Sequence, residues 1–218
     1  MASTKPDPSA IIIQEALPEH VSSLSTMDIR SFHPTNAFHR QVFPDTPLVI
    51  SWWSQIFSDE INDPTAHVII ALDSKATDPA LHVVGVICMR LMDPAVSGAG
   101  AWTMYPFTKD HDAKEFQPSV ELMAEWREKL FGKDQWHYLL EFVGVDHGYK
   151  GAGVGKRLLD RACEIADEKG YSVFVEGNQF AVGWYQKCGF EEKGSKLMDG
   201  KEAYRQHILV RPVRGDSR

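Results

Sequence analysis

The sequence predicts an α/β fold built on one mixed β-sheet. Two observations support this fold class. In the segment 136–177, two apolar runs flank a glycine-rich turn and a basic amphipathic stretch that ends at Gly170, which is typical of a strand–helix–strand unit with parallel strands. On either side of this unit, short apolar runs are separated by turn residues, which favours antiparallel hairpins within 66–92 and 190–211.

The N-terminal part is expected to form a strand and two helices. "AIIIQEAL" (10–17) is rich in β-branched residues and predicts the first strand. A helix is expected over 18–30, because proline suits a first turn and apolar residues recur at helical spacing. A second helix follows Pro47 in "TPLVISWWSQIFSDEI". Its adjacent Trp52 and Trp53 cannot face the same way, so we expect core packing with one exposed edge.

The middle of the chain predicts a hairpin, a loop and a helix. Strands at 66–73 and 81–92 are separated by the turn-rich segment "SKATDPA". Residues 93–118 show no periodicity, and a stretch of that length is usually a functional loop, a lid or a mobile insertion. A helix is then expected to begin at Pro118 and to run to about Phe131.

The last third is expected to contain the strand–helix–strand unit, one more helix and a hairpin. The predicted elements are a strand at 136–146, a helix at 153–169, a strand at 171–177, a helix at 179–187 and a hairpin at 190–211. Asp199-Gly200 is a strong signal for the turn of that hairpin.

Composition and charge limit the class of protein. The chain has 218 residues, 43% of them hydrophobic, and a net charge of −7, so it lacks the basic surface that nucleic acids or anionic membranes would need. There is no run of 18 apolar residues, and the start "MASTKPDPSA" does not resemble a signal peptide. Three distant cysteines fit neither a disulfide framework nor a zinc site. We expect a cytoplasmic or nucleocytoplasmic protein without a metal, as a monomer or homodimer.

The length suggests one well-buried core. We expect a flexible leader at 1–10, a single domain at 11–211 and a polar tail at 212–218.

The glycine-rich segment Lys150-Gly151-Ala152-Gly153-Val154-Gly155 is the strongest functional signal. Alternate glycines allow positive φ and let a ligand approach the backbone closely. The first N–H groups of the helix that follows have no partner within the helix, and its dipole favours negative charge. Lys150 and Lys156, on the two sides of the loop, add to the positive electrostatic potential there. A phosphate or a diphosphate is the ligand that such a loop is suited to bind.

Three kinds of phosphate loop compete for this segment. A P-loop requires G-x-x-x-x-G-K-[ST], but Lys150 stands at the first glycine position and Arg157 at the Ser/Thr position. A dinucleotide loop requires G-x-G-x-x-G, and Lys156 stands where the third glycine belongs. Glu176 would mimic the ribose-binding acid of that fold, but too few residues follow to complete its sheet. The third kind fits the sequence better.

Lys150 to Gly155 resembles the [QR]-x-x-G-x-[GA] segment of the GNAT superfamily of acyl-CoA-dependent N-acetyltransferases. The segment "NQFAVGWYQKCGF" (178–190) is similar to the second signature of that superfamily, N-x-x-A…Y-x-x-x-GF. The resemblance covers Leu139 to about Lys193. Lys150 replaces the usual glutamine or arginine, and His147 stands where a proline often ends the strand, so the turn is expected to be less rigid.

The resemblance implies a largely antiparallel sheet whose two central parallel strands splay around the cofactor, with helices on both faces. It implies acetyl-CoA as co-substrate, with the diphosphate on the loop amides and the pantetheine arm paired to the preceding strand. Asn178 could bond that arm, or could be the N-cap of the next helix. The expected cofactor-binding residues are Val143, Gly144, Val145, Lys150, Gly151, Ala152, Gly153, Val154, Gly155, Lys156, Asn178 and Tyr185.

Catalytic candidates follow from what acyl transfer to an amine needs. Deprotonating an amine of pKa about 10.4 at pH 7 costs roughly 4–5 kcal/mol, so a base is useful. Glu141, in an apolar strand, is the first candidate for that base, Glu176 the second and His147 the third. Tyr185 matches the tyrosine that faces the CoA sulfur in many relatives and is the expected acid. A backbone N–H near Val145 would stabilise the oxyanion.

We therefore expect an N-acetyltransferase that moves an acetyl group from acetyl-CoA to a primary amine, first of all in a small molecule, by direct attack in a ternary complex. A protein N-terminus or lysine is the alternative acceptor. A non-catalytic acyl-CoA-binding module and a nicotinamide dehydrogenase are the alternatives from other classes. The N-terminal helices and the segment 93–118 are expected to form the acceptor side.

Overall fold

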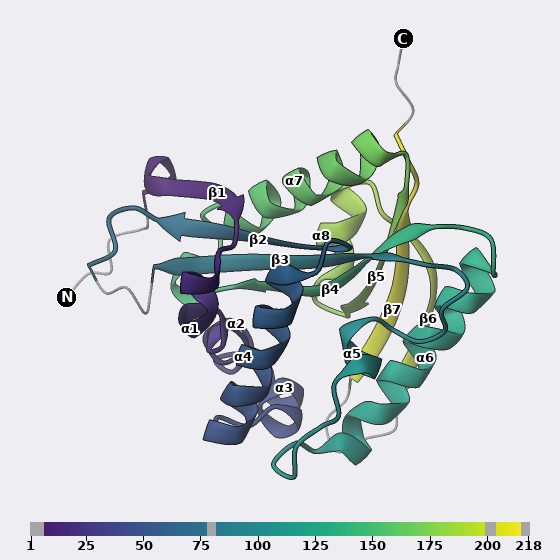
Figure 1. Ribbon diagram of the computed structural model, residues 1–218, viewed down its shortest axis with the longest axis horizontal. Coiled ribbons are helices and arrows are strands. Elements are labelled where there is room, and N and C mark those ends of the chain that lie inside the picture. The colour runs from purple at the N-terminus through teal and green to yellow at the C-terminus, as the bar shows by residue number, and fades with distance from the viewer. Residues whose placement is uncertain (1–6, 78–81, 199–203, 215–218) are drawn as a thin grey trace. The chain divides into compact units, whose positions relative to one another are not determined.

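The computed structural model describes residues 7–77, 82–198 and 204–214. Its strands pair in the order β1-β2-β3-β4-β5-β7-β6, and helices accompany them, so the α/β class is confirmed (Figure 1). The described residues form two compact units. Unit 1 takes its residues from Met1–Cys88, Phe107–His111 and Phe142–Ala162. Unit 2 takes its residues from Met89–Pro106, Asp112–Glu141 and Cys163–Arg218.

Unit 1 begins with most of the N-terminal elements. They are the 3-10 helix η1 (Pro8–Ala10), β1 (Ile11–Glu15), the 3-10 helix η2 (Pro18–His20), α1 (Val21–Leu24), α2 (Met27–Phe32), α3 (Ala37–Val42), α4 (Pro47–Asn62) and β2 (Ala66–Asp73). β1 pairs antiparallel with β2, from Ile11↔Asp73 to Glu15↔Ile69. Because η1 ends in the buried Ala10, the folded part begins a few residues before the expected end of the leader.

The helix expected over 18–30 is divided into three shorter pieces, η2, α1 and α2. The interruption falls at two hydroxyl residues. Ser25 Oγ donates to the carbonyl of Ser22 at 2.9 Å, and Thr26 Oγ1 donates to that of Ser23 at 3.2 Å. Such local side-chain bonds compete with the helical pattern and turn the chain. The short helix α3 was not predicted, although Asn36 is its N-cap and accepts from His39 N–H at 3.1 Å.

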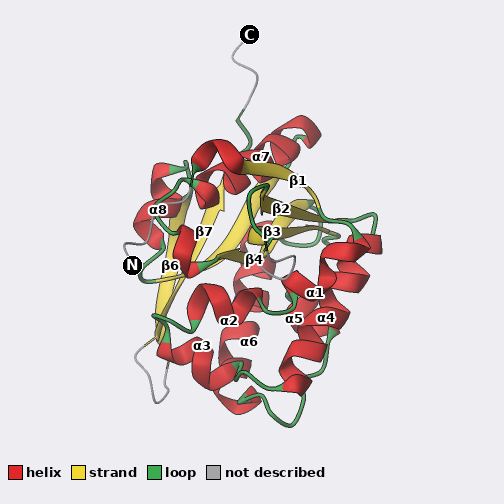
Figure 2. Cartoon of the chain, turned by 90° about the vertical axis from the view of Figure 1, so that its left-hand side faces the viewer, coloured by secondary structure: helices red, strands yellow, loops and turns green. Residues whose placement is uncertain are grey.

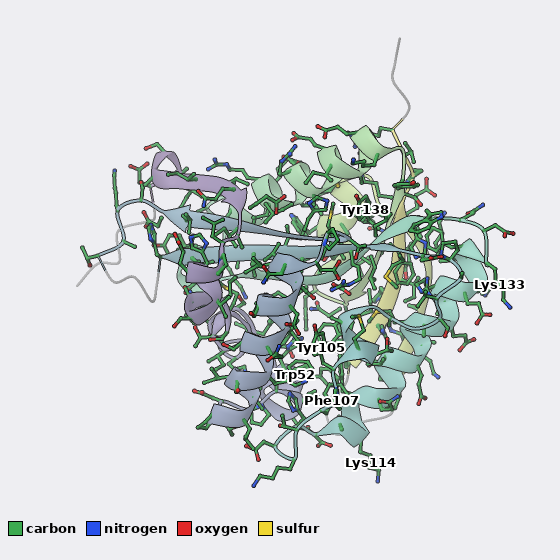
Figure 3. All side chains as sticks on the ribbon, viewed as in Figure 1. Trp52, Tyr105, Phe107, Lys114, Lys133 and Tyr138 are labelled. Carbon is green, nitrogen blue, oxygen red and sulfur yellow. The ribbon has the colours of Figure 1, made fainter. Side chains whose placement is uncertain are left out.

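Helix α4 follows Thr46 as N-cap and Pro47 at its first turn, as predicted. Both of its tryptophans are buried, Trp52 at 7% and Trp53 at 2% exposure, so the expected exposed edge is absent. Their rings meet edge to face at 4.9 Å. Phe107 covers Trp52 at a ring separation of 5.7 Å (Figure 3). The pair therefore belongs to the aromatic core of unit 1.

The residues that pair in the parallel strands belong to unit 2 and confirm the strand–helix–strand prediction. β4 (His137–Val145) pairs parallel with β5 (Ser172–Asn178), from His137↔Ser172 to Leu140↔Val175. Both strands continue beyond the last of these pairs. The connecting helix α7 (Val154–Lys169) ends before Gly170, whose φ of +74° is the left-handed conformation that glycine favours.

The predicted C-terminal hairpin is also present. β6 (Glu191–Met198) pairs antiparallel with β7 (Tyr204–Arg211), and β7 also pairs with β5, so the last strand lies inside the sheet and β6 at its edge (Figure 2). The predicted turn Asp199-Gly200 lies outside the described residues. β2 and β3 (Val83–Met92) are likewise neighbours in the sheet, as the first hairpin requires.

The segment 93–118 is more regular than expected. It contains α5 (Ala101–Met104), and α6 (Ala113–Phe131) begins five residues before the predicted start at Pro118. Asp112 is the N-cap of α6 and accepts from Glu115 N–H at 3.3 Å. Asp112-x-x-Glu115 is the spacing of a capping box, which was the overlooked signal. Pro118 lies inside the helix and removes one N–H donor there.

None of the helices in the described ranges has the length and apolarity needed to cross a membrane.

Candidate functional site

The glycine loop adopts the backbone that its sequence predicts. β4 ends at Val145, the 3-10 helix η4 covers His147–Tyr149, and α7 begins at Val154. Gly151 and Gly153 both have φ of +81°. A Cβ at either glycine would meet no atom within 4 Å. Glycine is therefore favoured at these two positions by backbone conformation and by the open approach to the main chain, and not by packing against neighbours.

Several amide groups of the loop have no backbone acceptor among the residues that the structure describes. Lys150 N–H donates to His147 at 3.3 Å and Ala152 N–H to Tyr149 at 3.2 Å, so these two amides are engaged. Within the described ranges, no backbone acceptor is found for the amides of four residues: Gly151, Gly153, Val154 and Gly155. Such a set of adjacent N–H groups at a helix start is the arrangement that binds an anion.

The turn before the loop is fixed by Asp146. Its Oδ1 accepts from Gly148 N–H at 2.9 Å, and its Oδ2 lies 2.7 Å from Nη1 of Arg30 on α2. Arg30 also donates to the carbonyl of Val83 at 3.0 Å. The turn is thus held on both sides even though His147 replaces proline. Sequence analysis missed Arg30 because no local pattern links it to a residue 116 positions away.

A second contact holds η4 in place. Tyr149 donates its hydroxyl to Asp73 Oδ2 at 2.6 Å, at the end of β2. Burial and this bond to a carboxylate raise the pKa of Tyr149 to about 12. The phenol therefore stays protonated and keeps the bond throughout the physiological range.

The cations around the loop differ in their contacts. Lys150 is exposed, and desolvation by neighbouring atoms lowers the pKa of its ammonium. Lys156 lies 2.5 Å from Asp160, one helical turn further along α7. Arg157 donates to the carbonyl of Ile11 at 3.1 Å, so it ties α7 to β1. Arg161 is exposed on α7.

The end of β4 leads into this loop with its side chains alternating. Phe142 and Gly144 are buried, whereas Val143 and Val145 are partly exposed. A Cβ at Gly144 would come within 2.7 Å of the Phe142 ring and 2.9 Å of Ser31 Oγ. Glycine at 144 therefore lets helix α2 approach this strand closely.

Asn178 is the last residue of β5, but it is not the N-cap of α8 (Val182–Lys187). That helix begins after Ala181, three residues later than predicted, and lacks a side-chain cap. Asn178 Oδ1 accepts instead from Phe180 N–H at 2.9 Å and so caps the turn between strand and helix. The amide nitrogen of its side chain takes no part in this turn.

Tyr185 lies on α8 and is 4% exposed. Its ring packs against Trp184 at 4.8 Å and Phe190 at 5.3 Å, and it comes close to Gly177 of β5. Burial and, next, the carboxylate of Glu176 raise the pKa of Tyr185 well above its usual value. Its hydroxyl forms no hydrogen bond with the described residues. Tyr185 is therefore a fixed, protonated phenol with a proton to donate.

Glu141 is buried in an ion pair. Its Oε1 lies 3.0 Å from Nε of Arg90 on β3 and accepts from Ala101 N–H at 2.6 Å, while its Oε2 is buried without a hydrogen-bond partner in the described part of the chain. The carboxylate thereby fixes the start of α5. Gly100, with φ of +59°, leaves the space that this carboxylate occupies.

The other two base candidates are in different surroundings. Glu176 is partly exposed on β5 and accepts from the hydroxyl of Tyr204 at 2.6 Å. Tyr204 is buried, and that burial together with Glu176 raises the pKa of its phenol well above the usual value. His147 is exposed on η4.

The segment before α5 is held by a buried arginine rather than left as a free loop. Arg127 of α6 donates from Nε to the carbonyl of Gly98 at 2.7 Å and from Nη2 to that of Val96. Beside these contacts lies a pocket of about 340 Å³. Its lining includes Pro94, Ala95, Ser97, Gly98, Glu125, Glu128 and Lys133, the last of them labelled in Figure 3. The mixed charge of this lining selects for no single class of ligand.

Comparison with known proteins identifies the family. A sequence model described as "Acetyltransferase (GNAT) family" matches residues 28–190, which is most of the chain. The chain belongs to this GNAT acetyltransferase family. The resemblance of the two motifs is thereby confirmed, and so is the mixed sheet with its parallel β4–β5 pair.

Individual relatives are more distant. Glucosamine 6-phosphate N-acetyltransferase of Trypanosoma brucei brucei is 42% identical over 73 residues, which are 33% of this chain and 48% of that protein. The chain thus spans about half the length of this curated relative. Among solved structures, arylalkylamine N-acetyltransferase 2 of Aedes aegypti has a TM-score of 0.67 at 14% identity, over 94% of this chain and 99% of that one. Arabidopsis thaliana NAA60, in complex with acetyl-CoA, has a TM-score of 0.58 at 14% identity, over 94% and 99%. These two likenesses show the GNAT fold.

Proposed function

We propose that this GNAT protein transfers an acetyl group from acetyl-CoA to the primary amine of a small molecule, by direct attack in a ternary complex. The observation that carries the proposal is the loop 150–155, which includes the start of helix α7: four of its amides find no backbone acceptor among the described residues, and two of its glycines have positive φ. In the distant relative NAA60, acetyl-CoA is the ligand bound. The acetyl-CoA that the family resemblance implies and the open, positive-φ backbone of this loop support the same assignment here.

Acetyl-CoA would be held mainly by main-chain groups. Its diphosphate would accept from the amides of Gly151, Gly153, Val154 and Gly155, with Lys150 and Lys156 as nearby positive charges. Hydrogen bonds to a charged group contribute about 1.5–3 kcal/mol each, and the helix start about 0.3–1 kcal/mol more. The pantetheine arm would pair with the backbone of Val143–Val145, in the manner of an added strand. The amide nitrogen of Asn178 remains available to bond this arm.

Tyr185 would donate the proton that the departing thiolate needs. Its raised pKa keeps the phenol protonated at neutral pH, so the proton is present when the thiolate departs. A backbone N–H near Val145 would stabilise the oxyanion that forms on the acetyl carbonyl. The acid and the oxyanion donor thus have candidates of suitable chemistry, and no metal is required in this scheme.

The carboxylates that the sequence suggested as the base both form hydrogen bonds within the protein. The Oε1 atom of Glu141 already accepts two hydrogen bonds, one from Arg90 and one from Ala101. Only its Oε2 atom remains to take a proton. Glu176 is bonded to Tyr204 but is partly exposed. Glu141, Glu176 and His147 stay the sequence-based candidates for this role in the proposed reaction.

A small-molecule acceptor is supported by the named activity of the curated relative, which is an amino-sugar N-acetyltransferase. A structural neighbour named arylalkylamine N-acetyltransferase points to the same broad class of acceptor. Glucosamine 6-phosphate and tyramine are therefore the first acceptors to test.

The experiment is a two-step assay on the full chain. Isothermal titration with acetyl-CoA and with NAD first tests which cofactor binds: acetyl-CoA should bind and NAD should not. Release of free CoA thiol is then followed with glucosamine 6-phosphate, tyramine, other small amines and a peptide N-terminus. Thiol release that depends on a small amine supports the proposal. Binding of acetyl-CoA without turnover of any amine would indicate a binding module, and turnover of the peptide alone would indicate a protein acetyltransferase.

A further inference from the structure

An aspartate–histidine pair that the scheme above does not use lies on the N-terminal helices of unit 1. Asp28 on α2 is 2% exposed, and its Oδ1 lies 2.9 Å from Nδ1 of His39 on α3. Its Oδ2 lies 3.5 Å from Nε2 of His33. No local sequence pattern links these histidines to Asp28, and the pairing is visible only in the fold.

The contacts determine which nitrogen of His39 carries a proton. Burial alone would raise the pKa of Asp28, but the histidines His39 and His33 outweigh it and lower that pKa. The carboxylate is therefore ionised at neutral pH and can only accept hydrogen bonds. Nδ1 of His39 must then be the donor, and a neutral His39 has its lone pair on Nε2.

The ring of His39 is held firmly and is still accessible. It stacks on Phe32 at 4.1 Å with an interplanar angle of 14°, and Phe43 lies 5.6 Å away. The side chain keeps 15% of its surface exposed. In the part of the chain that the structure describes, no group is hydrogen-bonded to Nε2. A buried carboxylate that orients an imidazole, with the second nitrogen left available, is the arrangement of a general base.

The pair adjoins the strand segment to which the proposed function assigns the pantetheine arm. Phe32, on which His39 stacks, meets the ring of Phe142 edge to face at 5.8 Å. Ser31, the preceding residue of α2, lies against Gly144, and its buried hydroxyl has no hydrogen-bond partner among the described residues. Helix α2 thus packs directly on residues 142–144 of β4, within the same unit as the glycine loop.

His33 is not equivalent to His39. Its Nε2 lies 2.9 Å from the carbonyl of Phe43 as well as near Asp28, and both are acceptors, so this nitrogen carries a proton. The bond to Asp28 raises the pKa of His33, which favours its cationic form beside the carboxylate. Two further charged or titratable groups act on the cluster. Asp45 acts on His33, and His111, whose pKa is lowered by burial, is influenced by Asp28.

We propose that Nε2 of His39 accepts the proton of the acceptor amine, directly or through one water, and that Asp28 is the positioning residue that holds His39. The proposal rests on the acetyl transfer proposed above. His39 takes one proton from the ammonium group, and the freed nitrogen lone pair forms the C–N bond to the thioester carbon. On collapse the C–S bond breaks, its electron pair leaves on the thiolate, and Tyr185 protonates that sulfur. The second N–H proton passes to water, the imidazolium releases its proton to solvent, and Tyr185 recovers one from solvent.

The test compares three single variants. His39→Asn keeps an amide donor toward Asp28 but has no basic nitrogen, and Asp28→Asn removes the anchor that fixes the tautomer. His67→Asn is the matched control, because His67 also contacts a carboxylate, Glu15, at 3.2 Å, but at the β1–β2 pair away from this cluster. The readouts are kcat and KM between pH 5.5 and 9, with acetyl-CoA and whichever of tyramine or glucosamine 6-phosphate the wild type acetylates.

His39→Asn should lower kcat by about 10²–10⁴-fold, with KM for acetyl-CoA unchanged and the acidic limb of the pH profile lost. Asp28→Asn should lower kcat and displace that limb, and His67→Asn should match the wild type. An acidic limb retained in His39→Asn but lost in Glu141→Gln would overturn the proposal in favour of Glu141.

A measurement on the wild type keeps the proposal open to refutation if a variant fails to fold. Long-range ¹H–¹⁵N correlation spectra of the histidine rings should show neutral His39 protonated at Nδ1. Protonation at Nε2 would overturn the proposal whatever the kinetics. A wild type that acetylates no amine would instead refute the proposed acetyl transfer, and the spectra would then still show whether Asp28 fixes the tautomer.

Discussion

Replacing Gly153 by alanine should separate cofactor binding from stability, because Gly170 provides a matched control. Both glycines have positive φ, +81° and +74°, and a Cβ at either one would meet no atom within 4 Å. A non-glycine residue in the left-handed conformation costs roughly 1–2 kcal/mol. For a chain of this size that corresponds to a fall in Tm of about 2–8 °C, and we expect similar falls in both variants.

Acetyl-CoA affinity should distinguish the two variants. The added methyl at position 153 would stand where the diphosphate approaches the loop amides and would displace it from one of them. One charge-assisted hydrogen bond contributes about 1.5–3 kcal/mol, so Kd should rise about 10- to 150-fold in Gly153→Ala. Gly170→Ala should bind as the wild type does. Isothermal titration measures Kd and differential scanning calorimetry measures Tm. Equal Kd values in the two variants, with equal losses of stability, would refute the assignment of this loop to the diphosphate.

Three further predictions follow from the buried groups. Tyr185→Phe should lower kcat about 10²–10⁴-fold, and a variant with wild-type kcat would exclude Tyr185 as the acid. Since the pKa of Tyr185 is raised, the wild-type pH–rate profile should show no basic limb from this phenol below about pH 10. Glu141→Gln should destabilise the fold by about 3–5 kcal/mol in urea titrations, because it removes the negative charge from a buried ion pair with Arg90. Asp160→Asn, which breaks the exposed pair with Lys156, should cost no more than about 1 kcal/mol, and similar losses in both variants would contradict a buried ion pair. Burial lowers the pKa of His137 to about 4, below its value in the unfolded chain, so the unfolded state binds one more proton between these two pKa values. The free energy of unfolding should therefore fall by about 1.4 kcal/mol per pH unit as pH drops from about 6.5 to 4. His137→Phe should remove this pH dependence, and an unchanged slope in that variant would argue against a neutral buried imidazole.

The elements that sequence predicted well are those whose signals are local. The strand, glycine loop and helix from 137 to 169 carry their own periodicity, and the glycines themselves mark the positions with positive φ. Element boundaries were less certain where two local signals competed. Pro118 suggested a helix start, but the helix begins directly after its N-cap, Asp112. Ser25 interrupts a helix whose apolar spacing is otherwise regular.

The site was only partly predictable because much of it depends on contacts between distant positions. The anion-binding role of the loop amides could be predicted from the sequence, since these main-chain groups need no partner side chain. The support of that loop by Arg30 and Asp146 arises only when α2 lies beside the end of β4, and the orientation of His39 by Asp28 arises only when α2 packs on α3. For Glu141, the sequence drew attention to the residue but did not reveal its contacts. A carboxylate in an apolar strand suggested a base, whereas its ion pair with Arg90 could not be deduced from one sequence.

The most direct test of the central claim is an amide NMR titration of the full chain with CoA. If the main chain at the start of α7 binds the diphosphate, the amide protons of Gly151, Gly153, Val154 and Gly155 should show the largest downfield shifts and should saturate together with the bound fraction of CoA. Saturable binding that leaves these four resonances unmoved, with the large shifts at other residues, would contradict the account.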